Sequence, residues 1–449
     1  MFLLCGCGSA PSDYQEFDQL SKQIFFSQDA EELKQEGFTK IDWRYSSEIS
    51  LCLQNKKNEK KLILFASPKF FYDEQERLNL IDTGLQKSFR NDYLYETAVS
   101  DIKTFFPGNM NKTDILVKSD IFIREASADE NNRRRCDFSY HWNLDFANGE
   151  RVKAKSFNGE ELDVIQYKNN PKENLILSCY PTTLGVSNDI QIMDQAISEI
   201  DFTFLSSNIE LQLTGGGYIL LSQKDKQILG VIQPPALRKE NSVSVNSYYS
   251  VKKNENGEYR ITVHLDQAFL NSSEIPAILN VCMDINKTNQ ADSQVYSQKP
   301  ELNTYLRNYA LLGSDNIYGE CENYLRFQFW NRFGIEPEDV DSIRYKTFFL
   351  NQSTEKNEIE VSSVLEDWCS LTLDWKTKAQ SGDVIQRINR RNEAESNRLI
   401  IDLTNCKNWV PDEALQRQGV VLKSKGPANI IATNDNVLFP AYTEIVFHE

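Results

Sequence analysis

Histidine is scarce in this chain of 449 residues, which contains three: His141, His264 and His448. The sequence also lacks a G-x-S-x-G, an H-E-x-x-H and a phosphate-cradling glycine loop. Histidine-based nucleophilic catalysis is therefore not expected, and His264, which stands in an alternating pattern, is predicted to be an exposed strand residue. The one glycine run, Thr214–Tyr218, opens a strand-like segment and not a helix, which predicts a hairpin or a bulge.

The cysteines form no pattern typical of a disulfide framework or a zinc site. No two of the nine are spaced as C-x-x-C, and an odd number remains when Cys5 and Cys7 at the N-terminus are set aside. We expect these remaining cysteines to be buried free thiols that act as small apolar residues.

Basic residues are fewer than acidic residues. Acidic residues outnumber basic residues 65 to 49, which gives a formal net charge of −16. A surface this negative repels phosphate backbones. The basic runs, such as Arg133–Arg135, are short and flanked by amide and acidic residues, as in solvated turns. Nucleic acid is therefore not the expected partner.

What the chain has in abundance, after about Lys40, is short strand-like segments separated by turn residues. The segments "IDFTFLS" and "YRITVHL" alternate apolar and polar residues, which predicts half-buried antiparallel strands. Asn148-Gly149 and Asn256-Gly257 predict tight hairpin turns, because both residues tolerate positive φ. The expected fold class is all-β, built from antiparallel sandwiches or meanders. Few helices are expected, at 301–311 and 413–416, with mixed helical periodicity at 14–36.

The segment "EDWCSLTLDW", Glu366–Trp375, admits two interpretations. Strand alternation would place Trp368, Ser370, Thr372 and Asp374 on one face and Cys369, Leu371, Leu373 and Trp375 on the other. The second face is wholly apolar, so the segment is predicted to be a strand of the core with solvated acids. The alternative is a catalytic carboxylate pair of the kind that glycoside hydrolysis needs, but no spacing singles out a pair among 65 acids.

The N-terminus carries a candidate lipid-attachment signal, although no apolar run approaches the roughly 20 residues that span a bilayer. "MFLLCGCGSAPS" contains Leu4-Cys5-Gly6-Cys7, which resembles the lipobox of bacterial lipoproteins. This resemblance implies that Cys7 receives a diacylglycerol thioether, that residues 1–7 are a truncated signal, and that the protein is exported and held at the cell membrane by lipid. A complete signal has a longer apolar segment, so the alternative is an untargeted N-terminus.

The C-terminal part contains several weak patterns in a fixed order. They are an "LRF" strand after a glycine-marked loop, a Trp-x(6)-Trp run, "IDLT", "GVVLK" and a proline-led last strand. This order resembles the DNRLRE domain, a jelly-roll β-sandwich of bacterial surface proteins that is related to carbohydrate-binding modules. The resemblance implies a linker at 286–300, a jelly-roll domain at 301–449, and a place for Trp368 and Trp375 in its core and rim.

The segment "ILFASPKFFYDEQERLNLIDTGL" and several later strands resemble the leading β region of Rhs-type wall-associated surface proteins. The resemblance implies a β region at 41–285, with the option of two subdomains that meet near 150–165, after a tether or helix at 8–40. The tyrosine-aspartate repeats and the C-terminal toxin of Rhs proteins are missing from the sequence, so toxin delivery is not implied.

Three functions remain open. The first is a non-enzymatic cell-surface lipoprotein whose β-sandwich module binds a polysaccharide or a surface partner. The second is a surface polysaccharide-degrading lyase or hydrolase, and the third is a structural or adhesion protein that binds another protein. Sugar binding needs exposed aromatic rings, for which the candidates are Tyr318, Tyr324, Trp330 and Trp409. No cofactor is predicted: a structural calcium ion near Asp412-Glu413 would suit such a module, but the spacing matches no calcium loop.

Overall fold

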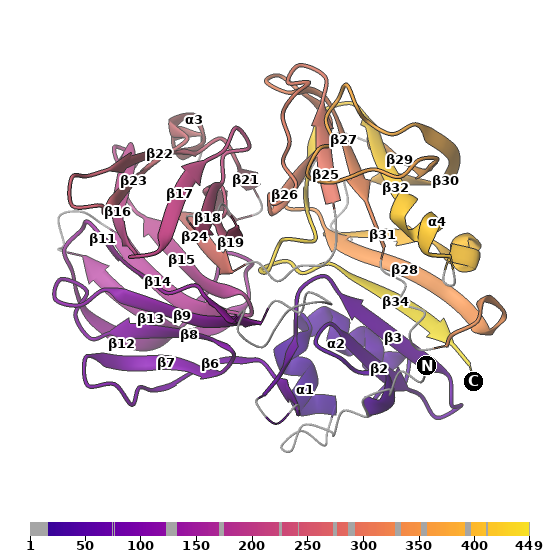
Figure 1. The fold of residues 1–449 in the computed structure, drawn as a ribbon, viewed down its shortest axis with the longest axis horizontal. Coiled ribbons are helices and arrows are strands. Elements are labelled where there is room, and N and C mark those ends of the chain that lie inside the picture. Colours follow the sequence, from indigo (N-terminus) through magenta and orange to yellow (C-terminus); the bar gives the residue numbers. More distant parts are fainter. Residues whose placement is uncertain are drawn as a thin grey trace. The chain divides into compact units, whose positions relative to one another are not determined.

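Antiparallel β-sheets make up most of the chain (Figure 1), so the expected all-β fold class is confirmed. The computed structural model describes residues 17–73, 75, 77–122, 133–169, 175–223, 227–240, 242–272, 276–285, 292–327, 334–351, 357–390, 397–409 and 412–448. The chain divides into two compact units. Unit 1 joins the two ends of the chain, up to Leu80 and from Thr288 onward, and unit 2 is Ile81–Lys287.

Unit 2 contains two large sheets. The nine-stranded sheet has, in order, β22 (Tyr248–Lys253), β23 (Tyr259–His264), β16 (Glu199–Leu205), β11 (Phe138–Trp142), β9 (Ile115–Phe122), β8 (Ile102–Pro107), β7 (Tyr93–Val99) and β6 (Asp82–Lys87), with β10 (Arg133–Arg135) beside β9. The ten-stranded sheet has β12 (Phe146–Lys155), β13 (Glu161–Asn169), β14 (Leu175–Thr182), β15 (Gly185–Ile192), β24 (Ala277–Ile285), β19 (Ile228–Ile232), β18 (Ile219–Gln223) and β17 (Ile209–Leu213), with β20 (Ala236–Lys239) and β21 (Ser242–Ser244) off this path. Helix α3 spans Gln267–Asn271.

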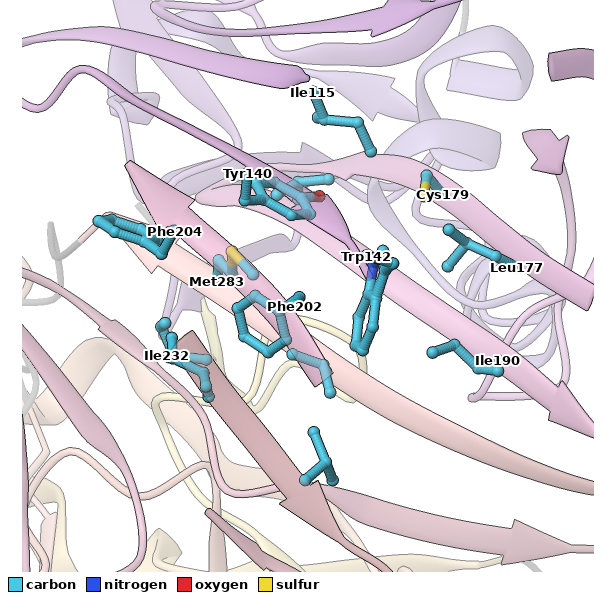
Figure 2. Packing of buried hydrophobic residues seen from close by; sticks show 14 of the residues in the cluster. Ile115, Tyr140, Trp142, Leu177, Cys179, Ile190, Phe202, Phe204, Ile232 and Met283 are labelled. Carbon is cyan, nitrogen blue, oxygen red and sulfur yellow. The ribbon is translucent and has the colours of Figure 1, made fainter. Parts of the chain in front are cut away.

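The core of unit 2 lies between these two sheets. Trp142 and Phe202 of the nine-stranded sheet lie in one cluster with Leu177 and Ile190 of the ten-stranded sheet (Figure 2), and all four are buried. Strand β16 contributes every second residue to this cluster, as the alternating sequence of "IDFTFLS" predicts. The intervening polar residues therefore lie on the opposite face of the nine-stranded sheet.

Unit 1 is a second sandwich. Its six-stranded sheet has β1 (Lys40–Ile41), β2 (Ser50–Gln54), β3 (Lys60–Phe65), β34 (Tyr442–Phe447), β28 (Val340–Phe348) and β31 (Arg398–Asp402). Its seven-stranded sheet has β30 (Ser381–Arg390), β29 (Asn357–Val364), β32 (Val420–Lys425), β27 (Gly319–Leu325), β26 (Tyr309–Asp315) and β33 (Asn429–Ala432), with β25 (Asp292–Tyr296) beside β27. The remaining elements are β4 (Phe70–Tyr72), β5 (Leu78–Leu80), α1 (Phe17–Ile24), α2 (Ser27–Gln35), α4 (Glu413–Gln418) and the 3-10 turns Trp43–Tyr45, Pro337–Asp339 and Thr404–Trp409.

Residues 41–80 were expected to belong to the β region at 41–285, but the structure places them in unit 1. Strand β3 pairs antiparallel with β34 along six residues, from Lys60 opposite Phe447 to Phe65 opposite Tyr442. The helical character expected near the N-terminus is confirmed by α1 and α2. The helices are not a tether, however, because their buried leucines Leu20 and Leu33 pack in one cluster with strands β2 and β3.

Ion pairs also hold α2 on the six-stranded sheet. Asp29 of α2 pairs with Arg398 of β31, and Glu32 accepts from Lys346 of β28 at 3.1 Å. Lys346 also lies 3.1 Å from Glu444 of β34. Lys346 and Glu444 are almost completely buried, so losing Lys346 would leave Glu444 with only the more distant Lys61, at 3.8 Å, as a cationic partner.

One of the two short helices predicted in the C-terminal part is present. The helix expected at 301–311 is wrong: the apolar run that begins at Tyr309 forms strand β26, buried on both faces. The helix expected at 413–416 is confirmed by α4, which Asp412 caps by accepting from two backbone N–H groups. None of the described helices is long and apolar enough to cross a membrane.

The turn predictions succeed in part. The glycine run at 214–218 joins β17 and β18 in a hairpin, and the segment with Asn256-Gly257 joins β22 and β23. Asn148-Gly149 is not a hairpin turn; it lies inside β12, where the register with β13 shifts, and is therefore a bulge. Tyr167 and Ile165 lie so close to Gly149 that a side chain there would displace them.

The segment Glu366–Trp375 is not a strand, so the alternation of its faces predicted above is wrong. It forms turns, in which the N–H groups of Thr372 and Leu373 donate to the carbonyl of Cys369. Trp368 and Leu373 are buried in a cluster with Val421 of β32, whereas Leu371 is 59% exposed. The segment therefore packs against the seven-stranded sheet through Trp368, Leu373 and the partly buried Trp375, and not through a continuous apolar face.

The cysteine prediction is largely confirmed. All seven cysteines in the described residues are free, and six of them are buried. Cys369, in the turn segment above, is exposed. Burial raises the pKa of Cys136 to about 12, so this thiol stays protonated and acts as a small apolar side chain.

Candidate functional site

The aromatic residues predicted to bind sugar do not come together in unit 1. Tyr324 is buried, packs edge to face on Trp368, and donates its hydroxyl to the Ala379 carbonyl at 2.8 Å. Tyr318 is half-buried against the Tyr296 ring. Trp409 is half-buried against the sandwich core, while Trp330 lies outside the described residues, as does Cys7. No shared exposed aromatic surface results from the three described residues.

A polar surface of a different kind lies in unit 2, on the outward face of the nine-stranded sheet. Strands β11, β16, β23 and β22 are neighbours in this sheet, and in each the core-facing residues alternate with polar ones. We call this surface the polar face. It comprises Asp114, Ser139, His141, Asn143, Glu199, Asp201, Thr203, Tyr248, Ser250, Lys252, Arg260, Thr262 and His264.

Hydrogen bonds order the middle of the polar face. Asp201 accepts from the Asn143 amide at 2.6 Å and from Arg260 Nε at 2.7 Å. The Thr203 hydroxyl donates to the Asn143 carbonyl oxygen at 2.9 Å. Because Asp201 and Arg260 fix each other, they present an acceptor and a fork of donors side by side. The pair is exposed at Arg260 and partly shielded at Asp201.

A second cluster surrounds His141. Its Nδ1 lies 2.9 Å from Asp114, whose other oxygen accepts from the Ser139 hydroxyl at 3.0 Å. The hydrogen bond from His141 lowers the pKa of Asp114, and the same contact raises the pKa of His141. The serine donates to the carboxylate and not to the imidazole, so these residues are not arranged as an activated nucleophile. They form a polar pair on a rigid strand.

The edge of the polar face carries an exposed aromatic ring. Tyr248 of β22 lies directly opposite His264 of β23, and their rings stack with centroids 4.6 Å apart and planes 20° apart. His264 is further held by the Ser250 hydroxyl at 2.9 Å and by Glu199 at 3.6 Å. Tyr248 remains 58% exposed. The imidazole stacks on the phenol ring while more than half of Tyr248 stays exposed, so the ring is both held and accessible.

The sequence predicted part of this surface and missed the rest. His264 was expected to be an exposed strand residue; the structure confirms its place in a strand, but the residue is half-buried, with its side chain 29% exposed. Tyr248 was missed because "SYYSV" contains two adjacent tyrosines, of which only one can face outward. Tyr249 is the buried one and donates its hydroxyl to the Gln233 carbonyl. The alternation continued back from Lys252 would have identified Tyr248.

Comparisons with known proteins add little. No protein-family model matches the chain, and no curated protein matches it. Among solved structures, one match is the N-terminal domain of an adhesin from Streptococcus gordonii, at 8% identity and a TM-score of 0.16. The match covers 85% of this chain and 95% of that one. A likeness this weak carries no argument about the fold or the function.

Proposed function

We propose that this protein is a non-enzymatic cell-surface lipoprotein that binds glycan, and that the polar face of unit 2 is its binding surface. The observation that supports this most is the ring of Tyr248, exposed yet held in place by His264 beside hydroxyl, amide and carboxylate groups. A sugar ring has an apolar C–H face and a polar rim of hydroxyl groups. A fixed aromatic ring can cover the first while hydrogen-bonding side chains reach the second.

Rigidity favours binding on a sheet face. The backbone of β22, β23 and β16 is fixed by continuous pairing, so little backbone entropy is lost when a ligand binds. The hydrogen bonds among Asn143, Asp201 and Arg260 hold the polar groups in advance. These features support a binding surface, and the arrangement of Ser139 and His141 gives no support to nucleophilic catalysis.

The remaining parts of the proposal concern location and domain type. A diacylglycerol on Cys7 would anchor the chain, since two acyl chains bind a bilayer far more stably than one. The sandwich of unit 1 would correspond to the DNRLRE-type module and unit 2 to the Rhs-type region. In this proposal unit 1 supports the protein at the surface, and unit 2 carries the ligand.

A glycan array tests the proposed function. We expect the full chain to bind a restricted set of surface polysaccharides and release no oligosaccharide from them on long incubation. Release of oligosaccharide would contradict the non-enzymatic assignment. Binding to no glycan, together with stoichiometric capture of a purified surface protein, would replace glycan binding with protein adhesion. Metabolic labelling with a fatty acid, compared with a Cys7→Ser variant, tests the lipid anchor.

A further inference from the structure

We infer that the ligand of the polar face is an uncharged oligosaccharide longer than one sugar ring, with one ring stacked on Tyr248 and a later ring at the Asp201–Arg260 pair. This inference rests on the proposed function and specifies its ligand class. Three observations carry it: the charge balance of the surface, the separation of its two recognition elements, and the kind of polar groups beside them.

The charge of the polar face disfavours an acidic glycan. Its acids are Asp114, Glu199 and Asp201, and its bases are Lys252 and Arg260. Arg260 and Asp201 pair at 2.7 Å and balance each other, which leaves the acids Asp114 and Glu199 against the base Lys252. The chain as a whole carries a formal net charge of −16. A carboxylated or sulfated polymer would be repelled by this surface, whereas an uncharged polymer would not.

The separation of the recognition elements sets a minimum ligand length. Tyr248 lies on β22 and Asp201 on β16, with β23 between them. Tyr248 is opposite His264, and His264 is in turn opposite Glu199. Asp201 is opposite Thr262, two residues along the strands from this row. Two strand spacings and two residues of rise put these backbone positions about 12 Å apart. A single sugar ring cannot contact both elements, so more than one ring must lie across the face.

The row that contains Asp201 also presents two hydroxyl groups, beside the row of Tyr248, His264 and Glu199. Ser250 and Thr262 are opposite each other in the pairing of β22 with β23, and Thr262 is opposite Asp201 in the pairing of β23 with β16. A hydroxyl both donates and accepts, which matches the hydroxyl groups of an uncharged sugar. At the far end the Asp201 carboxylate accepts and the Arg260 guanidinium donates, so the pair can bind two neighbouring sugar hydroxyls at once.

Titration calorimetry on the full chain tests this inference with three ligand series: uncharged oligosaccharides of increasing length, their monosaccharides, and uronic-acid or sulfated oligosaccharides. We expect affinity to rise with length beyond one ring, and acidic ligands to bind more weakly. Tyr248→Ala should lower affinity for the uncharged oligosaccharide about tenfold, and Tyr248→Phe should retain it because the stacking ring is kept. Phe89→Ala is the matched control, since Phe89 is 89% exposed in the turn between β6 and β7, at the opposite edge of the same sheet.

The outcomes separate this inference from the proposed function. Tighter binding of acidic ligands, still lost in Tyr248→Ala, would overturn the uncharged ligand class and leave glycan binding on this face intact. Equal affinity for monosaccharides and oligosaccharides would overturn the two-element arrangement. Binding unchanged in Tyr248→Ala would place the ligand elsewhere and contradict both. Near-ultraviolet circular dichroism confirms that each variant is folded, so that a loss of binding reports on the surface itself.

Discussion

A buried chain of polar groups in unit 2 predicts that this unit becomes less stable as pH rises from acid to neutral. The groups lie on β15 and β24, on the side of the ten-stranded sheet away from the sandwich core. Asn280 donates to Asp189 at 2.7 Å and to Ser187 at 2.8 Å. Further along the same strands, Cys282 donates to Asp284 at 3.2 Å. Both carboxyl groups are buried.

The size of this pH-dependent loss of stability follows from the pKa values of two buried aspartates. Burial raises the pKa of Asp189 from 3.8 to about 6, against the opposing effect of its hydrogen bonds, and raises the pKa of Asp284 from 3.8 to about 7. The folded state therefore holds protons that the unfolded chain releases, so stability is fully present below pH 4 and is lost as pH rises through 6 to 7. At about 1.4 kcal/mol per pH unit, the losses are about 3 kcal/mol for Asp189 and about 4 kcal/mol for Asp284.

Amide hydrogen exchange localised to β14, β15 and β24 measures this loss between pH 4.5 and 8, after correction for intrinsic exchange rates. Within this pH range we expect Asp284→Asn to remove about 3 kcal/mol of the pH dependence, because a side-chain amide keeps the shape of the carboxyl without titrating. Asp145→Asn, at an exposed aspartate of the same unit, should leave the pH dependence unchanged. An unaltered pH dependence in Asp284→Asn would refute the assignment of the proton to this buried group.

Three further predictions concern stability and are checked by chemical denaturation. Gly185→Ala should destabilise unit 2 by more than about 2 kcal/mol, since its Cβ would lie 2.1 Å from the Met283 carbonyl, whereas Gly217→Ala, in open space at φ +83°, should cost about 1 to 2 kcal/mol. Lys346→Met should cost about 3 to 5 kcal/mol, because Glu444 would keep only the more distant Lys61, at 3.8 Å, and adding Glu444→Leu should restore part of the loss; no restoration would contradict the ion-pair account. Trp368→Ala should cost about 3 to 5 kcal/mol and Leu371→Ala less than about 0.5 kcal/mol, and a larger cost at Leu371 than at Trp368 would contradict the turn structure of this segment.

Local patterns in the sequence predicted the strands well where one face of a sheet is buried. "IDFTFLS" and "YRITVHL" form β16 and β23. Apolar residues at every second position indicate which face of each strand packs on the core. The same reasoning failed for 366–375, where alternation over ten residues arose without a strand. There the amide of Asn303, which is distant in sequence, donates to the carbonyls of Ser370 and Leu373 and fixes the turns.

Local sequence patterns could not predict which distant strands pair with each other. Strands β3 and β34 lie near opposite ends of the chain, and nothing within either segment indicates that the other is its neighbour. The organisation of unit 1, and the docking of α2 on it, therefore could not be predicted. The polar face could be predicted in part, since His264 was placed in a strand with its side chain away from the core. Its stacking on Tyr248 depends on the register of β22 with β23, which only the folded sheet defines.

A crystal structure of the full chain with a bound oligosaccharide tests the central claim most directly. The account predicts a sugar ring against the exposed ring of Tyr248 and a second contact at Asp201 and Arg260. A ligand bound instead on unit 1, beside Tyr318 or Trp409, would contradict the assignment of the binding surface to unit 2.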